Sequence, residues 1–184
     1  MAAMRGLPSR QKLNIETRAV HAAAWQTAYP GIVPARTLQA FTVANRRQYW
    51  AGVRLDDRAS DRPVFVALDD GAVVGFAVCG PPRDPDMPFD AELYVVNVDP
   101  GHWRRGVGRR LFARCVEHLS ASGRRSFYLW VLRANDRARR FYESLEGKPL
   151  ADRARDADFD GIGVPEIPYG WEELPIVAFS GGSL

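Results

Sequence analysis

The chain has 184 residues, of which 46% are hydrophobic and 26% are charged, as in an ordinary soluble globular protein. At this length we expect a single domain over residues 1–184. The net charge is +3, yet basic and aromatic residues do not interleave as they do on a single-strand binding face, so a nucleic-acid partner is not expected.

The cysteines and the N-terminal segment indicate the compartment. Cys79 and Cys115 each fall in an apolar pattern, where a buried free thiol is the usual occupant, and this fits a reducing environment. No stretch approaches the ~20 apolar residues that a transmembrane helix needs. Residues 1–14 lack the apolar core of a secretory signal and are expected to be irregular. We therefore predict a cytoplasmic protein with no membrane partner.

The first third of the chain has helical periodicity. Residues 16–29 carry apolar side chains at helical spacing, and Pro30-Gly31 ends the run. A second helix is predicted over residues 35–53. The short connection PGIVP between the two helices is placed where it can line a site.

The period then changes to that of a sheet. Residues 63–68 and 72–80 are β-rich and are separated by Asp69-Asp70-Gly71, which predicts a hairpin. Residues 81–88 contain four prolines and predict a loop. Residues 91–98 are apolar over most of their length, as in a strand that is covered on both faces.

Helices and strands then alternate. Residues 107–120 form an amphipathic pattern, 126–132 read as a buried strand, and Asn135 or Asp136 can cap the helix that follows. The rest of the chain is rich in Asp, Gly and Pro, which predicts an acidic loop before a final edge strand at 173–180. This order of elements indicates an α/β fold with a mixed sheet.

The stretch DPGHWRRGVGRRL, which follows the expected strand at 91–98, predicts an anion site. Gly106 and Gly108 let the backbone approach a ligand, and the next helix directs free N–H groups toward the loop. A dinucleotide fingerprint is excluded because a third glycine is missing. A P-loop is excluded because Gly147-Lys148 is followed by proline.

This loop resembles the coenzyme A loop of the GCN5-related N-acetyltransferase (GNAT) superfamily. The family pattern [Q/R]-x-x-G-x-[G/A] reads here Trp103-Arg104-Arg105-Gly106-Val107-Gly108. The family's N-x-x-A-x-x-F-Y follows downstream as Asn135, Ala138, Phe141 and Tyr142. The resemblance is strongest over residues 64–145. Trp103 departs from it, because a polar residue is expected there, and the departure removes one side-chain contact.

The resemblance implies a mixed, mostly antiparallel sheet flanked by about four helices, with the strands at 91–98 and 126–132 splayed apart to form an acetyl-CoA cleft. The sequence lacks a clear strand before its first helix, which the family normally has. The expected cofactor contacts are Val96, Asn97, Val98, Arg104, Arg105, Gly106, Val107, Gly108, Arg109, Asn135, Ala138, Phe141 and Tyr142.

The implied reaction is acetyl transfer from acetyl-CoA to a primary amine in a ternary complex. The resemblance makes Glu92 the general base, the Val98 amide the oxyanion donor and Tyr142 the acid that protonates the thiolate. Alternation along a strand would place Glu92, Tyr94 and Val96 on one side. The structural alternatives are a solvent-exposed position or an ion pair for Glu92 and a core position for Tyr142.

The acceptor is less defined by the sequence than the cofactor. Trp25, Tyr29, Glu92 and Tyr94 are candidate acceptor contacts, and a small-molecule or peptide amine remains open. No group of His, Cys and carboxylate residues has metal-ligand spacing, so no metal is expected. A homodimer is possible in this family. The rival interpretation is a GNAT-like module that binds acyl-CoA or a partner protein without turnover.

Overall fold

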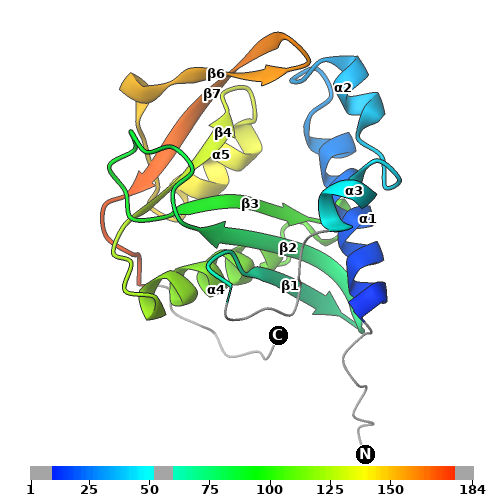
Figure 1. Ribbon diagram of the computed structural model, residues 1–184, viewed down its shortest axis with the longest axis horizontal. Helices are drawn as coiled ribbons and strands as arrows, with labels where there is room; N and C mark the ends of the chain where they lie inside the picture. The colour runs from blue at the N-terminus through cyan, green and yellow to red at the C-terminus, as the bar shows by residue number, and fades with distance from the viewer. Residues whose placement is uncertain (1–9, 52–59, 177–184) are drawn as a thin grey trace, which may run out of the picture.

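The computed structural model describes residues 10–51 and 60–176. Its strands form one mixed β-sheet, and helices pack against the two faces of this sheet (Figure 1). The α-helices are α1 (Arg10–Ala28), α2 (Ala35–Ala40), α3 (Arg46–Ala51), α4 (Val107–Ala121) and α5 (Asp136–Glu143). The strands are β1 (Val64–Asp69), β2 (Ala72–Gly80), β3 (Glu92–Val98), β4 (Phe127–Leu132), β5 (Lys148–Pro149), β6 (Arg155–Phe159) and β7 (Ile162–Trp171).

The sheet runs in the order β1-β2-β3-β4-β7-β5, and β6 pairs with β7. All pairs are antiparallel except β3 with β4. This confirms the predicted mixed, mostly antiparallel sheet. Apolar side chains from α4, the end of α5 and one face of the sheet form the larger core cluster, whereas α1 and α3 cover the opposite face (Figure 1).

Two Asp-Gly turns build the hairpins of this sheet. Asp70 and Gly71 have φ angles of 50° and 75° and join β1 to β2, as predicted. Asp160 and Gly161 have φ angles of 56° and 80° and join β6 to β7 in the same way. The prediction of an acidic loop in this region was wrong, because the second Asp-Gly pair supplies the positive φ angles that a tight hairpin requires.

Two predicted helices and one predicted strand need correction. The pattern over 35–53 is not one helix, because the chain leaves α2 at Phe41 (φ −84°, ψ 66°) and the Asn45 side chain donates a hydrogen bond to the Ala40 carbonyl. Helix α1 begins at Arg10, inside the segment expected to be irregular. Residues 173–176 form no strand, and 177–180 lie outside the described residues, as do 1–9, 52 and 53.

The central feature of the sheet is the separation of β3 from β4. These strands are in register at one pair only, Glu92 with Tyr128, where the Tyr128 amide donates to the Ala91 carbonyl at 3.2 Å. Beyond it the two strands diverge, which confirms the predicted splay. A β-bulge contributes: β2 residues Val78 and Cys79 pair with Val95 and Leu93, so Tyr94 is an extra residue in β3. Bulges bend a strand and increase its twist.

His21 makes the stability of this fold depend on pH. The ring is buried beneath α1 among aromatic side chains, and its Nδ1 accepts a hydrogen bond from Trp50 Nε1 at 3.1 Å. Burial, assisted by the charge of Arg46, lowers the pKa of His21 to about 3. The unfolded chain, with an ordinary histidine pKa of about 6.5, binds this proton much more readily.

We therefore expect the free energy of unfolding to fall as the pH drops below 6.5, by up to about 1.4 kcal/mol per pH unit from this residue. Urea denaturation at pH 7.0, 6.0 and 5.0 measures the slope. His21→Asn keeps an acceptor for Trp50 but cannot titrate, so it should flatten the profile. An equal slope in the variant would assign the pH dependence to other groups.

Candidate functional site

The open edge of β3 faces the gap between the splayed strands. The Asp99 amide donates to Val74 of β2 at 2.9 Å. Because successive residues direct their backbone groups to opposite sides of a strand, Val96 and Val98 direct theirs away from β2 and toward the gap. Their amides thus have the direction that an added, strand-like ligand would require. The Asn97 backbone is directed toward β2, and its side-chain Nδ2 is buried with no hydrogen-bond partner among residues 10–51 and 60–176.

The loop after β3 forms a cradle of backbone amides. Arg104 and Gly106 have φ angles of 64° and 79°, so two left-handed residues turn the chain into α4, with Gly106 as its N-cap. The amides of Val107 and Gly108 are in the first helical turn and have no intrahelical acceptor. Consecutive amides in such a turn, together with the helix dipole, favour an anion.

The side chains around this cradle add positive charge. Arg104, Arg105, Arg109 and Arg110 are exposed, and none of them forms a salt bridge with a carboxylate within the described ranges. Arginines without carboxylate partners next to free amides form a site suited to phosphate groups. The structure thus brings together the loop residues that the sequence predicted.

Helix α5 forms the other wall of the site. The Asn135 side chain caps it by accepting the Ala138 amide at 3.1 Å, as predicted. Phe141 packs against the start of α4, where a Cβ on Gly108 would lie 3.3 Å from its ring. Glycine at 108 therefore lets the two helices approach closely. Burial raises the pKa of Tyr29, which follows α1, and the nearby Asn135 side chain partly offsets this increase.

Tyr142 lies on the inner face of α5. Its ring is buried and packs edge-on against Trp171, with centroids 6.2 Å apart. Burial, with smaller contributions from Tyr29 and Cys115, raises the pKa of Tyr142 above its ordinary value. The phenol therefore keeps its proton at neutral pH.

Two residues of this wall were not found from the sequence as contacts of the site. Trp103 donates from Nε1 to the Val98 carbonyl at 2.9 Å, so the residue that departs from the family pattern does form a side-chain contact. Arg137, in the first turn of α5, places its guanidinium carbon 3.7 Å from the centre of the Trp103 ring. No sequence spacing predicts this pair, because Trp103 lies in the loop after β3 and Arg137 lies in α5.

Glu92 lies at the other end of β3 in a dense polar cluster. Its carboxylate is 1% exposed and accepts hydrogen bonds from the Arg83 backbone amide (3.0 Å), from the Arg83 guanidinium and from the Tyr128 hydroxyl (3.0 Å). The Glu92 carboxylate in turn raises the pKa of Arg83. Burial and the same carboxylate raise the pKa of Tyr128. Glu92 therefore forms an ion pair with Arg83, which was the structural alternative to a catalytic role.

The bulge at Tyr94 corrects the predicted facing of β3 side chains. Leu93 and Val96 both pack into the core cluster beneath α4, whereas Val95 packs on the opposite face. Glu92, next to Leu93, therefore points to the face opposite Val96. The expectation that Glu92 and Val96 share a side was wrong, because the extra residue inverts the alternation.

The predicted acceptor residues fall into two groups. Trp25 stacks on Phe41 with ring centroids 3.9 Å apart, and Tyr29 packs beside it. Tyr94 instead adjoins the cluster of Glu92: its hydroxyl donates to the Pro81 carbonyl at 2.5 Å, and the Arg83 guanidinium lies over its ring. The two groups are on α1 and on β3, respectively.

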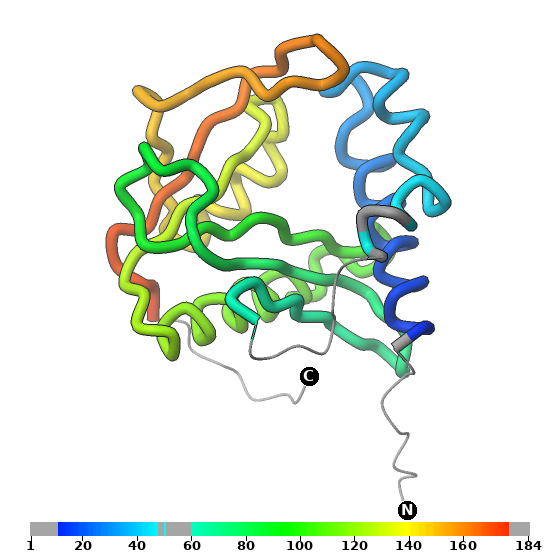
Figure 2. The backbone as a smooth tube through the Cα atoms, viewed as in Figure 1, coloured from blue at the N-terminus to red at the C-terminus, as the bar shows by residue number. Residues whose placement is uncertain are grey.

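The β6–β7 hairpin reaches across to the α1 side. Its tip lies next to α2 (Figure 2), where Asp160 accepts hydrogen bonds from Thr37 at 2.5 Å and from Arg36. Val164 of the hairpin packs with Val33 and Leu132 in a small apolar cluster. The acidic residues of this segment do not gather at one acceptor site, since Asp160 binds α2 and Glu166 pairs with Arg155 at 2.8 Å.

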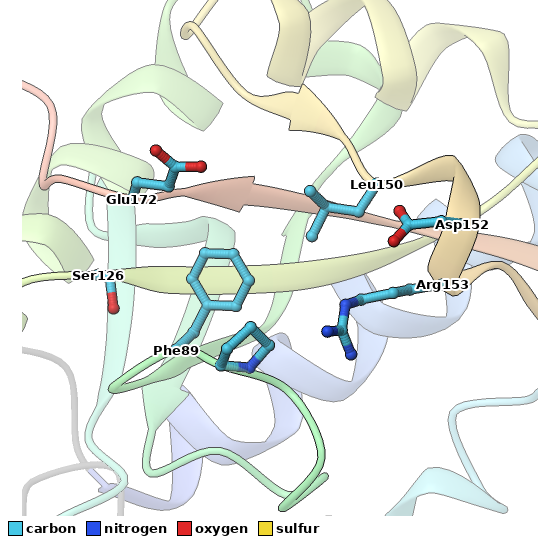
Figure 3. A pocket seen from close by; sticks show the side chains of 7 residues that line it. Phe89, Ser126, Leu150, Asp152, Arg153 and Glu172 are labelled. Carbon is cyan, nitrogen blue, oxygen red and sulfur yellow. The ribbon is translucent and has the colours of Figure 1, made fainter.

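A pocket of about 290 Å³ lies beside the start of β4 (Figure 3). It is lined by Pro88, Phe89, Ser126, Leu150, Asp152, Arg153 and Glu172. None of these residues belongs to the predicted site. Within the described residues no group of His, Cys, Asp and Glu is arranged to hold a metal ion, and no helix is long and apolar enough to cross a bilayer.

Comparison with known proteins identifies the family. Residues 22–147 match the acetyltransferase (GNAT) family. The chain belongs to this family. It is 31% identical over 156 residues to the uncharacterized N-acetyltransferase YuaI of Bacillus subtilis strain 168, a match that covers 84% of this chain and 85% of YuaI. The family and the enzyme class that the sequence predicted, N-acetyltransferase, are confirmed.

Solved structures share the GNAT fold. A GNAT-family protein from Desulfovibrio desulfuricans aligns with a TM-score of 0.62 and 22% identity over 90% of this chain and 94% of its own. The acetyltransferase YncA of Salmonella typhimurium, solved with its cofactor acetyl-CoA, aligns with a TM-score of 0.65 and 17% identity over 97% of both chains. At these identities the likeness concerns the fold.

The Glu92–Arg83 pair should contribute measurably to stability. In a double-mutant cycle with Glu92→Gln and Arg83→Gln, we expect a coupling of about 1–2 kcal/mol in the free energy of unfolding. This is less than for a fully buried pair, because the Arg83 side chain is 55% exposed. The exposed Arg114–Glu117 pair is the matched control, with an expected coupling below about 0.5 kcal/mol. Equal coupling in both cycles would contradict a special role for the buried pair.

Proposed function

We propose that this GNAT-family protein binds acetyl-CoA between β3 and β4 and transfers the acetyl group to a primary amine by direct attack. The observation that carries the proposal is the combination of two features on one side of the gap. One is the free backbone edge at Val96 and Val98, and the other is the arginine-rich amide cradle that begins α4.

Coenzyme A fits the charges and shapes of this site. Its pyrophosphate matches the amides that follow Arg104, and its pantetheine arm, an extended amide chain, can pair with the free edge of β3. When bound, acetyl-CoA supplies an activated thioester. The polypeptide contributes the binding edge, the fixed donors around the thioester carbonyl and a route for the protons.

The place of the thioester follows from the length of the pantetheine arm. Val98 adjoins the phosphate loop, and its carbonyl already accepts the Trp103 indole. The thioester, which the arm separates from the phosphates, belongs deeper between the strands. We therefore assign pantetheine pairing to Val98 and donation to the developing oxyanion to the Val96 amide, although the sequence pointed to Val98. A well-aimed donor of this kind contributes about 3–4 kcal/mol to the transition state.

Strand geometry supports the same choice. Six residues of extended chain separate Glu92 from Val98 by about 20 Å, which is too far for one side chain to act beside that amide. Four residues separate Glu92 from Val96, or about 13 Å. A water chain from the diverging strands can bridge the remaining distance.

The proton that leaves the amine needs an acceptor, and we propose Glu92 in that role, directly or through water. Arg83 must then release part of the carboxylate, and its half-exposed side chain has solvent to move into. Tyr142, which burial keeps protonated, is proposed as the donor to the coenzyme A thiolate.

The proposed acceptor is a small amine or a chain end. The contact of the β6–β7 hairpin with α2 through Asp160 bridges the side from which an amine would approach, and an extended peptide would have to displace it. Trp25 and Tyr29 lie beside this bridge and offer aromatic faces to a cationic amine.

Non-catalytic binding of acyl-CoA is the second candidate. It is favoured by one observation: both oxygens of Glu92 are already hydrogen-bonded. Binding without turnover, over a broad screen of amines, would decide for this candidate.

Isothermal titration with acetyl-CoA tests the cofactor site. We expect the parent protein to bind, and Gly106→Asp and Gly108→Glu to weaken binding at least about tenfold, or 1.4 kcal/mol, because each places a carboxylate among the amides that would receive phosphate. Gly123→Asp is the control. Gly123 has a similar φ angle of 75° at the far end of α4, with nothing within 4 Å of an added Cβ. No binding by folded parent protein would overturn the proposal.

Steady-state kinetics test the proton routes. Tyr142→Phe should lower kcat about 10²-fold while the KM for acetyl-CoA stays within about twofold, because the phenol acts on the leaving thiolate. Glu92→Gln should lower kcat similarly, because the amide cannot accept the proton of the amine. If kcat of folded Glu92→Gln stays within about twofold of the parent, the carboxylate is structural and the base is elsewhere.

A further inference from the structure

The side chains of Trp103 and Arg137 are in contact across the end of the gap that lies nearest the amide cradle. Trp103 follows β3 and donates to the Val98 carbonyl, and Arg137 belongs to α5, which follows β4. The Arg137 guanidinium lies over the indole with its carbon 3.7 Å from the ring centre. The stack therefore ties together the two sides of the site at the level of the phosphate cradle.

The Arg137 guanidinium has no carboxylate partner among the described residues. The side chain is exposed, and it forms no salt bridge there, whereas its neighbour Arg139 bonds to Tyr169 and lies near Asp136. A guanidinium held over an indole ring by this contact can still donate from its N–H groups, and its rotational freedom is reduced before a ligand arrives. Such a group is prepared to receive a phosphate in two parallel hydrogen bonds.

We infer that Arg137 is a further phosphate-binding residue of the coenzyme A site and that Trp103 is the positioning residue that orients it. Trp103 has two functions in this arrangement. Its ring holds the guanidinium beside the cradle, and its N–H fixes the Val98 carbonyl, so the edge of β3 that receives the pantetheine is set by the same side chain. This inference rests on the proposed binding of acetyl-CoA.

The inference explains the departure from the family pattern. A tryptophan at position 103 supplies a flat, apolar surface for stacking and one hydrogen-bond donor, which no polar side chain of the expected kind combines. The cost is the loss of a freely mobile polar group at the start of the loop. In return, α5 contributes one more arginine, Arg137, to the proposed phosphate site.

Isothermal titration with acetyl-CoA on four proteins tests the inference. Arg137→Gln and Trp103→Ala should each weaken binding about tenfold, and the double variant should be no weaker than about twentyfold, because Trp103 acts largely through Arg137. Trp103→Phe keeps the ring and should retain most of the Arg137 contribution. Circular dichroism and thermal melting verify that each variant is folded, and the exposed Arg137→Gln does not depend on core packing.

Two controls separate this role from general charge or general stability. Arg140→Gln removes the same charge from the same helix one turn later and should stay within twofold of the parent. Pantetheine, which lacks the phosphates, should bind Arg137→Gln as it binds the parent. Raising the salt concentration should weaken acetyl-CoA binding less in Arg137→Gln than in the parent.

The outcomes distinguish the inference from the proposed function. If the parent binds acetyl-CoA but Arg137→Gln matches Arg140→Gln, the inference is wrong and the cofactor site stands. Additive losses, about a hundredfold in the double variant, would also overturn it, since Trp103 would then act independently of Arg137. If folded parent protein does not bind acetyl-CoA, the proposed function fails and the inference fails with it.

Discussion

The limited pairing of β3 with β4 is the constraint on which the rest of the structure depends. A sheet normally satisfies the backbone groups of both neighbours, yet here one residue pair joins the strands before they diverge. The amides of Val96 and Val98 are consequently left facing a gap in the middle of the sheet. Apolar side chains of α4, α5, β3 and β4 pack in one core cluster on one face of the sheet, and α1 packs against β1, β2 and β3 on the other face. The backbone edge to which we assign acetyl-CoA is thus open because β3 and β4 do not continue their pairing.

The bulge at Tyr94 bends β3 beside this gap, and it also decides which face of the strand each side chain occupies. One extra residue inverts the side-chain alternation, so Glu92 faces the polar cluster of Arg83 while Val96 faces the core. The side chains of Glu92 and Val96 therefore point to opposite faces of one strand, and in the proposed mechanism a proton would travel around the strand where it diverges from β4. Buried carboxylates normally need a partner, and Arg83 from the proline-rich loop provides it. The same ion pair that allows Glu92 to be buried also limits its availability as a base.

Segments distant in the sequence enclose the gap from both ends. At the phosphate end, the stack of Trp103 and Arg137 joins the loop after β3 to α5. At the other end, Asp160 joins the β6–β7 hairpin to α2. The apolar cluster of Val33, Leu132 and Val164 reinforces the contact between the hairpin and the α1 side.

What the sequence alone determined were features encoded over a few neighbouring residues. The Asp70-Gly71 turn, the amphipathic face of α4, the Asn135 cap and the glycines of the phosphate loop are local signals, because turn geometry, helical period and capping depend on residues within one or two turns. The Asp160-Gly161 turn is an equally local signal, but the acidic residues around it favoured the prediction of a loop. Only the tertiary structure decided the pairing of Glu92 with Arg83, the inversion of β3 at Tyr94 and the stack of Trp103 with Arg137. Each of these depends on the register between strands or the approach of separate loops, and no periodicity within a single segment carries that information.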